Sequence, residues 1–453
     1  MRPSLPLLSP RSRGFLPALF ALGLALLASP TAQAVPSFAR QTGADCAACH
    51  VGAYGPQLTP FGIQFKLGGY SDTDGKDGKL PLSVMAVFNA TRSAKDLPED
   101  PGHGYHLNNN TALQEASVFV AGRIAENLGG FSQVTYSGIE HKWALDQVDL
   151  RFARNVKLGE SEALAGVSFN TNPTLTDPFN SIGQWAFPYV ESDFGFGQGN
   201  TPLVQNLAST VMGLNAYALW DQHWYGEIGL YDTLSARTLQ RIRASDPGKF
   251  KSPAVYWRLA YMVDRKRDNF SVGLVGFNAG LQPDRSQLGS ADRYSDVGVD
   301  ASYQFLGNRR HVVTVNASWM RERQTLNYSF ANLGADKLKQ TLDNFRLTTS
   351  YHYEQTWGAT LGLFSSRGSA DATLNGSSLN GRPDTTGYVL QADWTPWGKE
   401  TSWMSPLANA RLGLQYTGYS RYMGGSNYFD EVNGVQRKAA DNNTTMLFLW
   451  WSL

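Results

Sequence analysis

Val148-Asp149-Leu150-Arg151-Phe152 places two charged residues on one face of an extended strand and three apolar residues on the other. Successive side chains of a strand point to opposite faces, so this alternation predicts a β-strand with one polar and one apolar face. Charged side chains on a strand deep within a long chain need water or partners on their own face. A barrel with a wet lumen and a lipid-facing outer surface supplies both environments.

The same alternation recurs from residue 80 to the end of the chain. Residues 313–319, for example, read Val, Thr, Val, Asn, Ala, Ser and Trp. An even number of about sixteen such segments is typical of bacterial outer-membrane barrels. We expect strands at 81–91, 112–126, 131–139, 143–156, 162–171, 207–220, 224–232, 254–264, 270–281, 294–306, 311–323, 341–354, 356–367, 385–394, 407–419 and 443–453.

Short and long connections alternate between these segments. Residues 127–130 and 307–309 are tight turns, whereas 172–206, 233–253 and 420–442 are long. Outer-membrane barrels have short periplasmic turns and long extracellular loops. We therefore expect an all-β fold in which residues 80–453 form a transmembrane antiparallel β-barrel with its long loops outside the cell. Five tryptophans are expected in an aromatic girdle at the membrane surface, namely Trp394, Trp397, Trp403, Trp450 and Trp451.

The N-terminus has the composition of a secretory signal peptide. Arg2, Arg11 and Arg13 precede an apolar run over residues 15–28, and Ala32-Gln33-Ala34 is a small-x-small cleavage site. Residues 1–34 are therefore expected to be removed on export. The formal net charge of +1 excludes the strongly basic class of nucleic-acid-binding proteins. The expected partner of the barrel surface is outer-membrane lipid.

Cys46-Ala47-Ala48-Cys49-His50 is the attachment pattern for c-type haem. Each thiol would add to one vinyl group of the porphyrin, and the histidine would supply an axial nitrogen to the iron. The chain has 2 cysteines, so one haem accounts for both. Residues 35–79 are expected to form a short monohaem cytochrome c segment with a polar linker. A segment of about 40 residues needs a staple or a partner surface to stay folded.

Two other uses of the cysteine pair remain open. The first is a redox dithiol of the thioredoxin kind, although the strand–helix pattern of that fold does not surround the motif. The second is half of a zinc site, which would need two more ligands from distant histidines. Covalent haem is the preferred interpretation.

Residues 35–70 resemble a known family. The matching residues are 35–43 (VPSFARQTG), the haem motif at 46–50, Pro56, 58–62 (LTPFG), 65–67 (FKL) and Gly69-Tyr70. This pattern resembles the N-terminus of the fused monohaem cytochrome–porins, which include the outer-membrane iron(II) oxidases of iron-oxidising bacteria. The remainder of the chain is similar to that family only in its expected barrel architecture.

The resemblance implies electron uptake from extracellular Fe(II) by one covalent haem c on Cys46 and Cys49, with His50 as axial ligand. It also implies delivery of the electrons to a periplasmic carrier. We expect the N-terminal segment to enter the barrel lumen from the periplasmic side as a plug, with the haem about halfway across the membrane.

The sequence leaves the function and the sixth iron ligand open. The chain could instead be a diffusion channel whose haem segment is a structural or regulatory plug, or a cytochrome–porin with a donor other than Fe(II). The sixth iron ligand could be Met85, in the first strand, or His103 or His106, in the first long loop. The same loop also carries Asp96, Glu99 and Asp100, and carboxylate and imidazole groups suit Fe(II).

Overall fold

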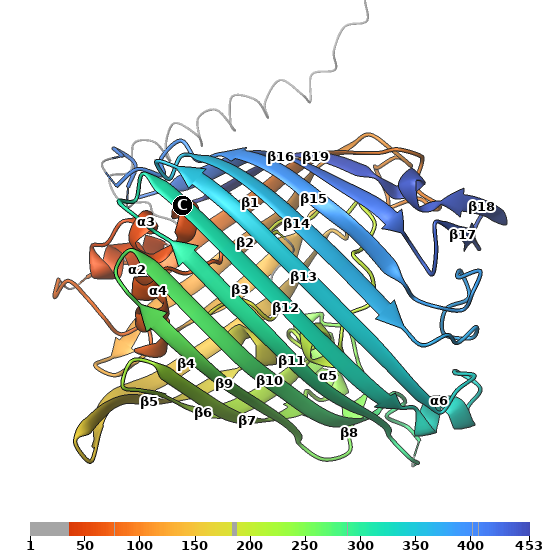
Figure 1. Cartoon of the computed structure of the whole chain (residues 1–453), viewed down its shortest axis with the longest axis horizontal. Helices are drawn as coiled ribbons and strands as arrows, with labels where there is room; N and C mark the ends of the chain where they lie inside the picture. Colours follow the sequence, from red (N-terminus) through yellow and green to blue (C-terminus); the bar gives the residue numbers. More distant parts are fainter. Residues whose placement is uncertain (1–35, 77, 184–187, 288, 401, 406) are drawn as a thin grey trace, which may run out of the picture.

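The computed structural model describes residues 36–76, 78–183, 188–287, 289–400, 402–405 and 407–453. Its main sheet has 17 strands, one of which, β8, is the two-residue segment Lys249–Phe250. The other sixteen described strands form a closed antiparallel barrel, because β1 pairs with both β2 and β19 (Figure 1). The expected signal peptide and its cleavage site lie outside the described residues.

All sixteen strands predicted from the alternation are present, within a few residues at each end. They are β1 (Leu82–Ser93), β2 (Asn110–Ala125), β3 (Leu128–Ser137), β4 (Lys142–Leu158), β5 (Ser161–Asn170), β6 (Val211–Trp220), β7 (Trp224–Thr233), β9 (Ala254–Asp264), β10 (Asp268–Gln282), β11 (Asp292–Phe305), β12 (His311–Thr325), β13 (Lys339–Tyr353), β14 (Trp357–Gly368), β15 (Thr385–Trp394), β16 (Asn409–Arg421) and β19 (Thr444–Ser452).

The two faces of the strands divide as expected. On β4, Asp149 and Arg151 are fully buried inside the barrel, whereas Leu150 and Phe152 are 36% and 45% exposed on its outer surface. An outer surface of Leu, Val, Phe and Trp around a polar interior is the arrangement of a barrel embedded in an outer membrane. No helix among the described residues is long and apolar enough to cross a bilayer.

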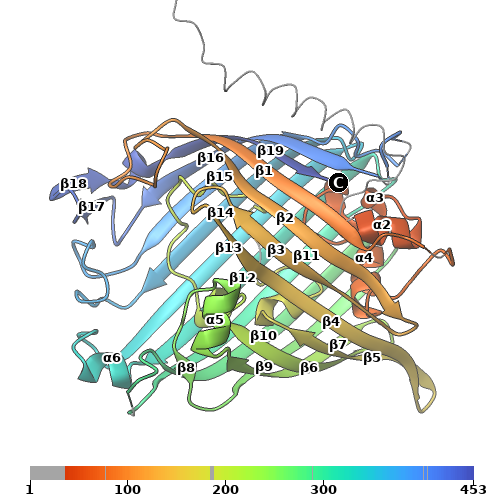
Figure 2. The same ribbon diagram turned by 180° about the vertical axis from the view of Figure 1, so that it is seen from behind.

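The two ends of the barrel differ. The N-terminal helices and the C-terminus lie at the end with the short turns (Figures 1 and 2). The opposite end carries short elements within segments for which the sequence predicts only long loops. These are α5 (Ala236–Ile242), β8, α6 (Asn327–Ala331) and the hairpin of β17 (Asn427–Asp430) and β18 (Val435–Lys438).

The long connection between β5 and β6 folds into the barrel, and we call residues 171–210 the lumen loop. Its described part includes the short helices η2 (Pro173–Thr176) and η3 (Leu203–Asn206). The expectation that residues 172–206 extend outside the cell is therefore wrong. Inward-facing side chains on three separate strands hold the loop: Gln415 Nε2 donates to Val190 O (2.9 Å), Ser366 Oγ to Asn200 O (2.6 Å) and Gln114 Nε2 to Glu191 O (2.8 Å).

Candidate functional site

The N-terminal segment, residues 36–70, lies inside the short-turn end of the barrel. It contains α2 (Pro36–Thr42), α3 (Cys46–Cys49), η1 (Val51–Ala53) and α4 (Pro60–Leu67). Side chains from widely separated strands, and Arg309 from the turn before β12, donate hydrogen bonds to its carbonyls, so it is a plug, as expected. The bonds are Tyr217 Oη to Leu67 O (2.7 Å), Gln304 Nε2 to Leu58 O (2.8 Å), Arg309 Nη2 to Ala47 O (2.6 Å), Asn409 Nδ2 to Ala53 O (2.8 Å) and Arg411 Nη2 to Gly52 O (3.1 Å).

The local fold of the segment follows from a few residues around Thr59. Thr59 caps α4 by accepting a hydrogen bond from the Gly62 amide (3.3 Å), and Pro60 occupies the first helical turn, where its missing N–H costs nothing. The Thr59 amide donates to Cys49 O (2.9 Å), which ties α4 to the end of α3. A Cβ on Gly62 would overlap the same carbonyl oxygen, so only glycine permits this close packing.

Cys46, Cys49 and His50 lie on and directly after α3. The two cysteines are free thiols that are partly exposed to the cavity described below. Burial raises the pKa of Cys46 to about 11, helped by the negative charge of Asp45, and burial raises the pKa of Cys49 to about 12. A thioredoxin-like site requires the opposite shift, towards a reactive thiolate. The protonated pair therefore does not suit dithiol redox chemistry.

His50 is a partly buried, neutral imidazole. Burial lowers its pKa to about 4, so the ring is uncharged at neutral pH, which is the form that binds metal. Its Nδ1 is buried and has no hydrogen-bond partner among the described residues. Buried nitrogens are ordinarily satisfied, so this one points to an interaction that the protein alone does not provide.

A cavity opens beside the motif. Its volume is about 220 Å³. Cys46, Cys49 and His50 line one side of it. Phe38, Phe65 and Tyr70 also line it, and these rings contact one another: Phe38 stacks on Tyr70 at 5.2 Å and meets Phe65 edge-on at 5.1 Å. These three aromatic residues belong to the pattern on which the family resemblance rests.

The opposite side of the cavity is the barrel wall itself. Met85 on β1, Phe119 on β2, Phe131 on β3 and Trp450 on β19 all line it. Such an apolar patch is unusual on the inner wall of an outer-membrane barrel, which is normally polar. Trp450 is only 8% exposed and meets Tyr54 edge-on at 4.9 Å, so its expected place in the outer aromatic girdle is wrong.

The depth of the cavity also differs from the expectation. Met85 is the fourth residue of β1, Asn409 the first of β16 and Ser452 the last of β19, and all three line the cavity. The cavity therefore lies near the short-turn end and not halfway along the barrel. The reason is that α2 is bound to the start of β1, where the Ser37 amide donates to Ser83 Oγ (3.3 Å).

The residues present fit a haem c better than a zinc ion. Two thiols spaced Cys-x-x-Cys, a neutral histidine with an unpartnered nitrogen and an apolar cavity between plug and wall are what a covalently tethered porphyrin needs. No group of three or more His, Cys, Asp or Glu side chains in the described chain is placed to hold a metal ion. The second half of a zinc site is therefore missing from this part of the protein, as is a dedicated iron site in the first long loop.

The plug is expected to depend on Gly52. This residue has a φ of +68°, and a Cβ there would lie 2.5 Å from the His352 ring and 3.0 Å from Arg411 Nη2. Gly52→Ala should weaken the docking of the N-terminal segment by about 1–3 kcal/mol, through left-handed strain and overpacking. Faster proteolysis of residues 36–70 in the detergent-solubilised barrel would show that the segment docks more weakly.

Gly75→Ala is the matched control. Gly75 lies in the linker with a φ of +79°, and a Cβ there would have no other atom within 4 Å, so this variant reports strain without the clash. If the two variants were cleaved at equal rates, the contact of Gly52 with His352 would not be holding the plug.

Comparisons with known proteins add little beyond the fold. No protein-family model matches the chain, and no curated protein matches it either. Similar solved structures include OmpF of Salmonella typhi in complex with daunomycin (14% identity, TM-score 0.49, covering 82% of this chain and 97% of that one). A second is the outer-membrane channel DcaP of Acinetobacter baumannii (11% identity, TM-score 0.44, covering 82% of this chain and 96% of that one). A third is an anion-selective porin from Comamonas acidovorans (9% identity, TM-score 0.42, covering 82% of this chain and 98% of that one).

Proposed function

We propose that this chain is an outer-membrane cytochrome–porin that takes electrons from extracellular Fe(II) and passes them to a periplasmic carrier. One c-type haem, attached to Cys46 and Cys49 with His50 as an axial ligand, would serve as its redox centre. The observation that carries the proposal is the apolar cavity between the Cys-x-x-Cys-His motif and the barrel wall. A bound haem c supplies a one-electron redox centre, and oxidation of Fe(II) is a one-electron reaction.

The chain's own residues have distinct tasks in this proposal. Cys46 and Cys49 tether the group, and the burial of His50 keeps its imidazole neutral. Phe119, Phe131 and Trp450 exclude water from the wall side, and an apolar surrounding of this kind tunes the potential of a redox centre. The barrel holds the site inside its lumen near the short-turn end, so a donor outside the cell would reach it along the lumen.

Transfer across the membrane can be tested in proteoliposomes. A soluble c-type cytochrome is trapped in its oxidised form inside the vesicles, and Fe(II) is added outside. The proposal predicts reduction of the trapped cytochrome with the intact protein, and none with the Cys46→Ser, Cys49→Ser double variant. Equal reduction by both proteins would mean that Fe(II) itself enters through the lumen.

A diffusion channel with a structural or regulatory plug is the second candidate function. Beyond the apolar patch, the inward-facing residues of β1 become polar, with Asn89, Thr91 and Ser93 following Val87. A polar inner wall suits passage of hydrated solutes through the part of the lumen outside the plug. This function and electron transfer use different parts of the same barrel.

The second function predicts a pH-dependent ion selectivity. Burial raises the pKa of Glu191 to about 7. Asp193 is more exposed, but desolvation by the surrounding chain and the negative charge of Glu140 raise its pKa to about 6. Both residues lie on the lumen loop. Their carboxyl groups are neutral below these pKa values and ionise as the pH rises through them, so cation preference should increase between about pH 5 and pH 8.

Reversal potentials across a planar bilayer under a salt gradient measure this selectivity. The Glu191→Gln, Asp193→Asn double variant should show a flat response over the same pH range. A variant that kept the full pH dependence would place the titrating groups elsewhere in the lumen.

A further inference from the structure

We infer that the sulfur of Met85 is the second axial ligand of the haem, so that the barrel wall itself coordinates the iron. This inference rests on the proposed function, because it needs a haem in the cavity. It goes further by assigning the one iron ligand that the motif does not supply. It also means that plug and barrel form the redox site together, since His50 belongs to one and Met85 to the other.

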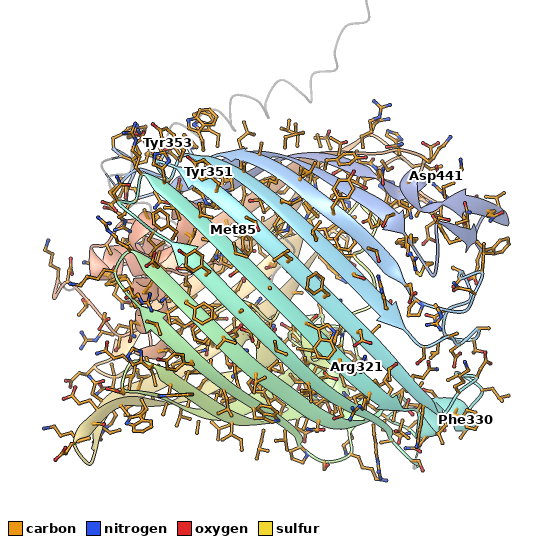
Figure 3. All side chains as sticks on the ribbon, viewed as in Figure 1. Met85, Arg321, Phe330, Tyr351, Tyr353 and Asp441 are labelled. Carbon is orange, nitrogen blue, oxygen red and sulfur yellow. The ribbon has the colours of Figure 1, made fainter. Side chains whose placement is uncertain are left out.

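The position of Met85 carries the inference. Met85 lies on β1, where the inward-facing residues are Ser83, Met85 and Val87. Its side chain is 8% exposed and lines the same cavity as Cys46, Cys49 and His50. β1 pairs through Met85 with Ser452 of β19 and with Ser117 of β2, so the backbone of this ligand is fixed on both sides. Figure 3 labels Met85 towards the end of the barrel where the N-terminal segment lies.

Other side chains that line the cavity and could bind iron are engaged elsewhere. Lys66 Nζ donates hydrogen bonds to Leu175 O (2.7 Å) and Asp177 O (2.9 Å). Tyr70 Oη donates to Asp149 Oδ2 (2.7 Å). Coordination by either residue would break buried hydrogen bonds, which is unfavourable.

Tyr54 and Asn409 are also poor candidates. A tyrosine binds ferric iron as the phenolate, and burial raises the pKa of Tyr54 well above its ordinary value, so it stays a phenol. The Asn409 amide donates to Ala53 O (2.8 Å). A thioether has neither a proton to lose nor a strong hydrogen bond to give up. Met85 is therefore the lining side chain that can bind iron at the least cost.

The two histidines considered from the sequence lie far from this cavity. His103 and His106 are exposed in the loop that follows Ser93, at the other end of β1. Ser93 lies eight positions after Met85, which is about 26 Å of strand at about 3.3 Å per residue. Neither histidine lines the cavity.

Ligation by methionine also suits the proposed direction of electron flow. Replacing a nitrogen ligand by a thioether raises the reduction potential of a haem. A higher potential makes the centre a better acceptor of electrons from a donor. The same bond would anchor the plug to β1, in addition to the hydrogen bonds already described.

The test uses the full-length precursor, exported and matured in a host with c-type haem attachment machinery, and purified from outer membranes. The oxidised wild-type protein should show the weak red charge-transfer absorption band of methionine-ligated ferric haem. Met85→Leu should lose this band and bind carbon monoxide in the reduced state, because it opens a coordination position. Met85→His should replace the band by the spectrum of a bis-histidine haem and lower the reduction potential.

Met446→Leu is the matched control. Met446 belongs to the same buried cluster as Met85 but does not line the cavity, so its variant should keep the band. Heat-modifiable migration on gels verifies that each variant has an assembled barrel, and Met85→His provides the result if Met85→Leu does not assemble.

Retention of the band in an assembled Met85→Leu or Met85→His protein, or its absence from a coloured wild-type protein, would overturn the ligand assignment while leaving the haem in place. A colourless wild-type protein would overturn the haem and this inference together.

Discussion

Replacing both Cys46 and Cys49 by serine is expected to abolish covalent haem attachment completely and to leave the barrel assembled. Serine cannot form a thioether with a vinyl group, and these are the 2 cysteines of the chain. Neither residue belongs to a barrel strand, so strand pairing does not depend on them. Haem that survives denaturation, stained by its peroxidase activity on a gel, measures the loss.

The same double variant separates the two candidate functions. An electron-transfer protein would lose oxidation of Fe(II), whereas a diffusion channel would keep its solute flux in a liposome-swelling assay. The haem proposal would be contradicted if the variant still carried covalently bound haem. Unchanged Fe(II) oxidation by a haem-free barrel would contradict the proposed redox role.

Arg258→Met is expected to release the lumen loop and to cost about 3–5 kcal/mol, the usual penalty for leaving buried charges without their partner. Arg258 is fully buried on β9. It binds both oxygens of Asp300 at 2.9 Å each and reaches Asp177 of the lumen loop at 3.1 Å. Without the guanidinium, two carboxylates remain buried near one another. A larger single-channel conductance would report release of the loop, and a lower unfolding midpoint in denaturant would report the lost stability.

Arg321→Met serves as the control for this variant. Arg321 pairs with Asp343 at 2.8 Å on the outer surface and is labelled in Figure 3. This pair faces away from the lumen, so conductance should stay unchanged. If Arg258→Met also left the conductance unchanged, the ion pair with Asp177 would not be what holds the loop in the lumen.

The strands could be predicted from the sequence because each carries its own signal. Alternation along β4, for example, depends only on whether residues such as Asp149 and Leu150 face water or lipid. The direction of the lumen loop could not be predicted in this way. It depends on Arg258 pairing with both Asp177 and Asp300, which are distant in sequence and come together only when the barrel closes.

The candidate site could be predicted only where the residues that form it are adjacent in sequence. Cys46, Cys49 and His50 are adjacent in sequence, so their spacing alone indicates the chemistry. The wall of the cavity joins Met85, near the start of the barrel, to Trp450, near its end, because β1 pairs with β19. Alternation shows which way Met85 faces but cannot show that it faces the motif. It equally cannot show that Trp450 faces inwards, because both faces of β19 carry large apolar residues.

The most direct measurement is the absorption spectrum of the purified, oxidised barrel before and after anaerobic addition of Fe(II). The account predicts a coloured protein whose spectrum changes to that of a reduced c-type haem when Fe(II) is added. Reduction by dithionite but not by Fe(II) would retain the haem and contradict Fe(II) as the donor. A colourless, fully assembled barrel from a host that attaches haem to other exported cytochromes would contradict the central claim.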